Sequence, residues 1–137
     1  LGAGSAWEGE QPLAIEAEVG ALGDGSFTAT GPMFGGSHMQ LGPMAALRVG
    51  GLTVVVSSRR MQAADQAMFR HLGIEPADHA ALVLKSSVHF RADFTAIAGE
   101  IIVVASPGPN PVDHLALDYR RLCPGLRLLP LGPAYAG

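Results

Sequence analysis

The stretch AALRVGGLTVVV, residues 45–56, consists of two short apolar runs separated by two glycines. A Gly-Gly pair is a common two-residue hairpin loop, because glycine adopts the positive φ angles that the tight turn requires. Residues 45–49 and 52–56 are therefore predicted to form a β-hairpin. The second run is apolar on both faces, which predicts a central rather than an edge position in a sheet.

Two more strands are predicted on the amino-terminal side of this hairpin. Apolar residues alternate with polar or small ones from Leu13 to Val19, the period of a half-buried strand. A Gly-Asp-Gly turn at 23–25 precedes a β-prone run at 27–30, so these two strands are predicted to pair. Residues 31–36 read GPMFGG, which predicts a loop.

Short helices and further strands are predicted after the hairpin. Asp65 stands where an N-cap would, and apolar residues at helical spacing follow as far as Gly73, which predicts a short helix. Strands are predicted at residues 80–84 and 101–105. A helix or irregular turn is predicted between them, at residues 90–97.

The end of the chain is predicted to be less regular. Prolines interrupt residues 106–111, one or two helical turns are predicted within 113–121, and the tail from Pro124 is predicted to be extended. The whole pattern predicts an α/β fold with a mixed β-sheet and short helices packed on it. Residues 1–11 are interpreted as a linker or leading loop, and residues 12–137 as one domain.

Composition excludes several functional classes. The chain has 137 residues, 48% of them apolar, enough for a core without disulfides. A net charge of −3 provides no basic surface for nucleic acid, and no apolar run reaches the roughly 18 residues of a membrane helix. Cys123 is the single cysteine, which is compatible with a cytoplasmic location. Only 15% of residues are charged, so part of the surface is expected to contact another domain or subunit.

Polar side chains follow the second run of the hairpin. Arg59, Arg60 and Gln62 lie just beyond it, and strand ends are where α/β sheets place ligand-binding groups. An arginine there can bind a carboxylate through two parallel hydrogen bonds. The commoner alternative is that both arginines form ion pairs with acids such as Glu16 or Asp65.

A second polar segment, KSSVHFR at residues 85–91, follows the strand predicted at 80–84. His89 can act as an acid, a base or a ligand near neutral pH, and Lys85 can stabilise developing negative charge. Arg91 adds another group for anion binding. The sequence leaves open whether this segment is functional or His89 is a hydrogen-bonded structural residue.

The other titratable candidates are weaker. His38, His71, His79 and His114 show no spacing typical of a zinc site, so no metal ligand is predicted in this chain. Cys123 has no evident base partner and is a poor candidate for a nucleophile.

Eight segments taken in order carry a resemblance to a known family. The most specific is Lys-Ser-x-x-His-Phe-Arg at 85–91. The others are GEQPL at 9–13, DGSF at 24–27, GPM at 31–33, LG at 41–42, SRRMQ at 58–62, FRHLGI at 69–74 and YRR at 119–121. Together they resemble the carboxyl-terminal domain of MlrC-like (microcystinase C) zinc metallopeptidases over nearly the entire chain. The chain departs from the family pattern at 122–125, LCPG, where basic residues directly before a proline are expected.

The resemblance implies a longer enzyme in which a larger amino-terminal domain binds zinc and hydrolyses amide bonds, with linearised microcystin as the family's named substrate. The metal ligands would lie in that domain, and this chain alone would be inactive. The implied partners are the amino-terminal metal-binding domain and a peptide or amide substrate, with a homo-oligomer as a further option. Both polar segments would face the interdomain cleft. The implied catalytic auxiliaries are His89 and Lys85, and the implied substrate-binding residues are Arg59, Arg60, Gln62 and Arg91.

Two other interpretations remain. The domain could be a non-catalytic structural or dimerisation module, which its low content of charged residues favours. It could also be a free-standing domain that binds a small molecule, although the absent initiator Met and the loop-like start argue against this.

Overall fold

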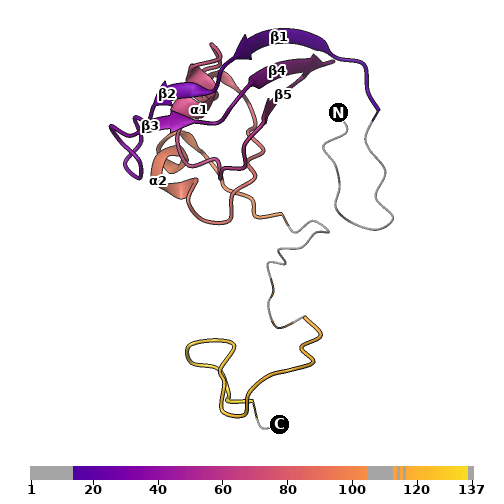
Figure 1. The fold of residues 1–137 in the computed structure, drawn as a ribbon, viewed down its shortest axis with the longest axis vertical. Coiled ribbons are helices and arrows are strands. Elements are labelled where there is room, and N and C mark those ends of the chain that lie inside the picture. Colours follow the sequence, from indigo (N-terminus) through magenta and orange to yellow (C-terminus); the bar gives the residue numbers. More distant parts are fainter. Residues whose placement is uncertain (1–13, 105–112, 114, 116, 136–137) are drawn as a thin grey trace. The chain divides into compact units, whose positions relative to one another are not determined.

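The computed structural model describes residues 14–104, 113, 115 and 117–135. The chain forms two compact units, Leu1–Gly99 and Glu100–Gly137. All the assigned strands and helices of the described residues lie in the first unit (Figure 1). None of these helices is long and apolar enough to cross a membrane.

Five strands form two sheets. β1 (Glu18–Gly23), β4 (Met44–Val49) and β5 (Leu52–Ser57) make a three-stranded sheet with β4 in the middle, and β2 (Ser26–Thr28) pairs with β3 (His38–Gln40). Every strand pairing in the described residues is antiparallel.

Short helices follow the strands along the chain. They are α1 (Ala67–Arg70), the 3₁₀ turn η1 (Pro76–Asp78), α2 (Arg91–Phe94) and the 3₁₀ turn η2 (Thr95–Ile97). The helical segment predicted after Asp65 and the one predicted at 90–97 are therefore confirmed.

The core of the first unit lies between the three-stranded sheet and α1. Its buried side chains are Leu41, Met44, Ala46, Met68 and Leu72. Residues from the sheet and from the helical segment thus share one apolar centre. The predicted α/β class, a sheet with short helices packed on it, is confirmed, and the strands supply most of the regular structure.

The hairpin predicted from the Gly-Gly pair is confirmed, but its position in the sheet is not. Val49 pairs with Leu52, and Gly50 has a φ of 57°. β5 lies at an edge of the described sheet, whereas β4 is central. The prediction equated an apolar composition with burial on both faces. One face of this sheet is apolar although it is only partly buried. The apolar composition of β5 therefore does not indicate a central position.

The first strand begins later than predicted. Residues 14–17 are not in a strand, and Leu13 lies outside the described residues. The pairing register of β1 with β4 shifts between Val19 and Ala21, which leaves Gly20 as a bulge. The bulge places Val19 and Ala21 on opposite faces, so the alternation read from the sequence cannot identify the buried face of β1.

The hairpin predicted between the first two strands is wrong, because β1 pairs with β4 and β2 pairs with β3. The reason lies at Gly25, which has a φ of 74°. A Cβ on Gly25 would lie 2.9 Å from the backbone nitrogen of Gly42. The chain therefore crosses closely over Gly42 at this turn instead of folding back along β1. The loop predicted at 31–36 is confirmed, and it connects β2 to β3.

The strand predicted at 80–84 is wrong. These residues form no strand, and the Val83 side chain is 100% exposed. Residues 101–104 are not in a strand either, and Ala105 lies outside the described residues. Short apolar runs predict strands only where a neighbouring strand is available to supply hydrogen bonds.

The described part of the second unit contains a turn where an extended tail was predicted. Arg127 forms a β-bridge with Ala134, and the Tyr135 amide donates to the Leu126 carbonyl at 2.8 Å. The tail from Pro124 therefore folds back on itself.

Other predictions fall on residues that the structure leaves undescribed. The linker at 1–11 and the break at 106–111 lie outside the described residues. The helical turns predicted within 113–121 lie partly outside them, and residues 117–121 are not helical.

Candidate functional site

The two polar segments singled out from the sequence are joined through Gln62 and Ser86. The Ser86 hydroxyl donates a hydrogen bond to Oε1 of Gln62 at 3.1 Å. The same hydroxyl oxygen accepts a hydrogen bond from the Phe90 amide at 3.2 Å. Because Gln62 belongs to one segment and Ser86 to the other, this contact brings residues 59–62 and 85–91 together.

A second set of contacts fixes the far end of the 85–91 segment. Oδ2 of Asp93 accepts from the Gln66 amide at 2.7 Å, and the Asp93 carbonyl accepts from Nε2 of Gln66 at 2.8 Å. Phe94 is only 3% exposed and packs edge-to-face on Phe69, with ring centroids 6.0 Å apart. The segment is therefore attached to the core on both sides, near Ser86 and near α2.

Between these attachments, the candidate side chains are accessible. Lys85 and Arg91 are exposed, and His89 is half-buried. The guanidinium carbon of Arg91 lies 5.1 Å from the centroid of the Phe90 ring, a cation–π geometry that steadies the arginine without occupying its hydrogen-bond donors. The predicted setting was wrong, because no strand precedes Lys85; the contact of Ser86 with Gln62 positions the segment instead.

Arg59 follows β5, as predicted, and it contacts residues 40–41 at the end of β3. Its amide donates to the Leu41 carbonyl at 2.9 Å, and its Nη1 donates to the Gln40 carbonyl at 3.3 Å. Within the described residues, neither Arg59 nor Arg60 forms an ion pair with Glu16 or any other acid.

Asp65, the other acid considered as a partner for these arginines, has different partners. Its carboxylate accepts hydrogen bonds from the amides of Gly31 at 2.7 Å and Ala67 at 2.9 Å. The hydroxyl of Thr30 donates a longer one at 3.4 Å. The N-cap position of α1 is Gln66 rather than the predicted Asp65, but the Asp65 carboxylate still binds the first amide of the helix and anchors the loop after β2.

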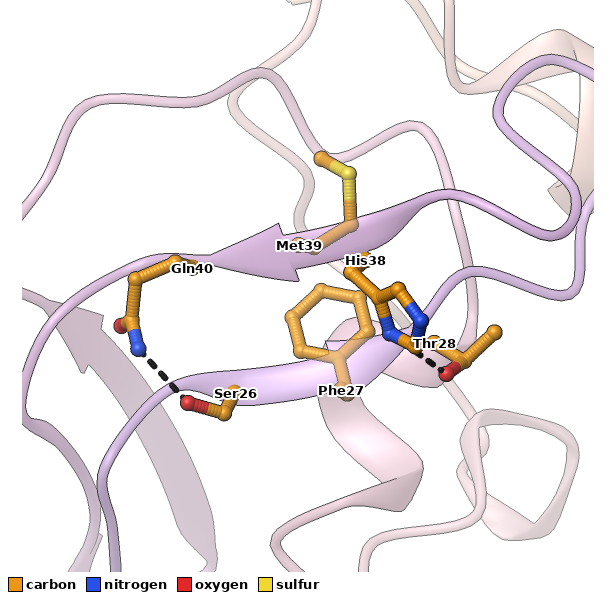
Figure 2. A pocket seen from close by; sticks show the side chains of 6 residues that line it. All are labelled: Ser26, Phe27, Thr28, His38, Met39 and Gln40. Carbon is orange, nitrogen blue, oxygen red and sulfur yellow. Dashed lines mark hydrogen bonds between the residues drawn. The ribbon is translucent and has the colours of Figure 1, made fainter.

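The contact of Arg59 with Gln40 places the first polar segment beside the β2–β3 ladder. Nε2 of Gln40 donates to the Ser26 hydroxyl at 2.6 Å, and Oγ1 of Thr28 lies 3.3 Å from Nδ1 of His38. Figure 2 shows these two polar pairs at opposite ends of the ladder, with one apolar pair between them. A hollow of about 430 Å³ is lined by Ser26, Phe27, Thr28, His38, Met39 and Gln40.

The spacing of His38 does not fit a zinc site, so the sequence gives no reason to select it as a candidate. A different signal was present. Residues 26–28 and 38–40 both read polar, apolar, polar, and the period of a strand places the outer residues of each run on one face. Pairing of the two runs then gathers four polar side chains, an arrangement that depends on tertiary contacts and cannot be read from either run alone.

No hydrogen bond or ion pair of the described residues joins Arg59 to Lys85 or His89. Across the same described ranges, no three His, Cys, Asp or Glu side chains are grouped so that they could hold a metal ion. Arginine, amide and hydroxyl donors of the two segments can bind a polar or anionic group, and the 85–91 segment also carries the half-buried imidazole of His89.

Comparison with known proteins gives two matches. A family model described as MlrC C-terminus matches residues 1–121. Microcystinase C from Sphingomonas sp is 34% identical over 89 residues, which cover 65% of this chain and 18% of that protein. The chain thus matches less than a fifth of the length of this relative.

Proposed function

The chain belongs to the MlrC C-terminus family, and from this membership we propose that it is the carboxyl-terminal domain of a zinc-dependent amide hydrolase. In this proposal a larger amino-terminal domain of the same protein binds zinc, and the present domain completes the substrate cleft. The similarity to Microcystinase C supports a hydrolase, and the short share of that relative that is matched supports a role as one part of a longer enzyme.

The observation that carries the proposal is the hydrogen bond between Ser86 and Gln62. It joins two segments that are otherwise separate in the chain, and both contain groups able to bind a substrate. Ligand sites in proteins characteristically combine a few such polar groups with a concave surface, often between two domains.

Zinc itself does not fit the residues that the structure describes, because they contain no suitable group of ligands. The zinc ligands are therefore proposed to lie elsewhere in the longer protein. The role of this domain rests on its own side chains.

Arg59 and Arg91 are proposed to hold a carboxylate of the substrate, with Arg60 and Gln62 contributing further donors. A guanidinium can donate two parallel hydrogen bonds to a carboxylate, which fixes the orientation of the bound group as well as its position. Orientation of this kind raises the rate of a reaction by holding the scissile amide in place.

His89 and Lys85 are proposed to act at the rim of the cleft. A protonated His89 would donate a hydrogen bond to the oxyanion that forms at the amide carbon, or a proton to the departing amine. Lys85 would add positive charge beside the developing oxyanion. Both side chains are available for these tasks, since neither makes a hydrogen bond or ion pair within the described part of the chain.

The test is amide hydrolysis by the longer, two-domain protein with His89→Ala and Arg59→Ala. We expect His89→Ala to lower kcat by about 10²-fold or more, in the range of a lost acid–base or oxyanion contact. Arg59→Ala should mainly raise KM for substrates with a free carboxylate. Unchanged kcat and KM in both variants would contradict the proposal, and substitution of Ser87, an exposed neighbour in the same segment, provides the control.

A further inference from the structure

The face of the three-stranded sheet that points away from the core is apolar throughout. β4 and β5 pair residue by residue, so alternate positions share a face. Ala46 and Val55 pair on the core face, where both contact the apolar cluster. The intervening positions, together with two residues of β1, form the outer face. Its members are Val19, Leu22, Ala45, Leu47, Val49, Leu52, Val54 and Val56.

The bulge in β1 completes this outer face. Val19 pairs with Leu47 and Leu22 pairs with Ala45, and the register shift between Val19 and Ala21 is what places both on the same side. Without the extra residue, only one of them would lie on the outer face. The bulge therefore extends the apolar outer face across β1, β4 and β5, the three strands that lie side by side in Figure 1.

Three residues of the outer face are mostly exposed, the other five are partly buried, and none of the eight carries a charge. Leu22 is 76% exposed, Leu52 68% and Val19 56%. The charged pair of the sheet, Arg48 and Glu18, lies at positions of the opposite face, with Nη1 and Oε1 3.4 Å apart. Contiguous apolar surface without charge is characteristic of a face that another protein surface covers.

The size of the face indicates what covers it. Each strand has six residues, so at the usual rise and strand spacing the face measures roughly 300 Å². Burial against a partner would remove roughly 600 Å² in total, below the approximately 1,200 Å² of a stable interface between separate proteins. It falls in the range of about 600–1,500 Å² for interfaces between domains of one chain, where tethering supplies a high effective concentration.

From this match of area and chemistry, we propose that the outer face of the β1–β4–β5 sheet is the docking surface for the amino-terminal domain of the same protein. The inference rests on the proposed two-domain enzyme and names the part of this domain that holds the two together. The partner surface is apolar and of similar size. The polar segments with Arg59 and Ser86 contribute no residue to this face.

The experiment uses the full-length protein with Leu22→Glu and Leu52→Glu, separately and together. Both side chains are mostly exposed in the domain itself, so the substitutions leave its fold intact. A carboxylate placed in an apolar interface loses its hydration without gaining a partner. We expect cleavage between the domains by a protease to accelerate at least about tenfold for the double variant, since cleavage follows the population of the open form.

Thr53→Glu is the matched control. Thr53 neighbours Leu52 on the same strand but lies on the opposite face, where it pairs with Arg48. The control introduces the same charge at an exposed site and should leave cleavage at the wild-type rate. Side-chain footprinting of the wild-type protein gives a second measurement that needs no variant, and Leu22 and Leu52 should be protected from labelling.

Three outcomes would overturn the docking surface: full labelling of both leucines, equal cleavage of the double variant and the Thr53→Glu control, or protection that appears only with concentration-dependent dimerisation in sedimentation. The last would assign the face to a second copy of the chain.

Zinc content and amide hydrolysis of the wild-type protein are measured in parallel. Protected leucines in a protein without zinc or activity would reject the proposed function and keep the docking surface; an active zinc enzyme with labelled leucines would do the reverse.

Discussion

Ser86 and Gln62 are hydrogen-bonded side chain to side chain across 24 positions of the sequence, with the hydroxyl donating to Oε1 at 3.1 Å. The hydroxyl oxygen also accepts from the Phe90 amide. One side chain thus fixes both the start of the 85–91 segment relative to the 59–62 segment and the turn that leads into α2. Removal of the Ser86 hydroxyl should make the candidate site less rigid without creating a cavity in the core.

Ser86→Ala should cost about 1 kcal/mol of stability, the usual net value of such hydrogen bonds, with part of the cost from the partners left unpaired. In the longer enzyme we expect a larger effect on catalysis, because His89 lies in the segment that loses its attachment. Denaturant titration and steady-state kinetics measure the two effects. Ser87→Ala is the control, since Ser87 is exposed; equal behaviour of the two variants would show that the Gln62 contact does not position the site.

Asp65→Ala should be among the most destabilising substitutions in the first unit. The carboxylate is 0% exposed and accepts from the amides of Gly31 and Ala67. Alanine would leave both N–H groups, one of them the first amide of α1, buried without acceptors, at a total cost of about 3 kcal/mol. Urea unfolding measures this cost, and Asp78→Ala, at an exposed position, should change stability by less than about 0.5 kcal/mol.

Gly25→Ala should destabilise the fold for two reasons at once. The residue has a φ of 74°, and an added Cβ would lie 2.9 Å from the backbone nitrogen of Gly42, so both strain and overlap oppose the substitution. We expect a loss of about 2–4 kcal/mol in thermal or denaturant unfolding. Gly51→Ala is matched to it, because a Cβ there meets nothing within 4 Å. A stable Gly25→Ala protein would mean that the crossing over Gly42 is not tight.

The parts of the fold that local sequence decides were predictable. The Gly-Gly loop sets the β4–β5 hairpin, and Asp65 and Gly73 mark the two ends of the α1 segment, because turn and cap preferences depend on neighbouring residues alone. The pairing of β1 with β4 was not predictable in this way. It depends on the bulge at Gly20 and on the close approach of Gly25 to Gly42, both of which involve residues distant in sequence.

The candidate site, too, was predictable only where local sequence decides it. Residues 59–62 and 85–91 could be singled out because polar groups cluster there, but the wrong strand at 80–84 gave the second segment a wrong setting. The contact between Ser86 and Gln62 has no sequence signature. The polar pairs of the β2–β3 ladder were missed because each strand contributes one residue to each pair. Which residues become partners depends on how the two strands pair in the folded protein.

Stability in acid should depend measurably on Arg70 and Glu75. Nε and Nη2 of Arg70 donate to the two carboxylate oxygens of Glu75 at 2.8 and 2.9 Å. These hydrogen bonds hold the pKa of Glu75 below its ordinary value of 4.5, against a smaller opposing effect of desolvation. A carboxyl whose folded pKa is lowered contributes stability above its unfolded pKa, and the contribution is lost as the pH falls through the folded value.

The window of loss therefore begins near pH 4.5 and extends below it. Arg70→Met removes the partner and also the donor to Oε1 of Gln66, which is a pH-independent loss. The difference in unfolding free energy between wild type and Arg70→Met should be constant at neutral pH and shrink below pH 4.5, with a small amplitude because both side chains are partly exposed. Arg121→Met, at an exposed position, should give a flat difference over the same range. A difference for Arg70→Met that stays constant down to acid unfolding would show that the ion pair contributes no pH-dependent stability, and that Arg70 acts through Gln66 alone.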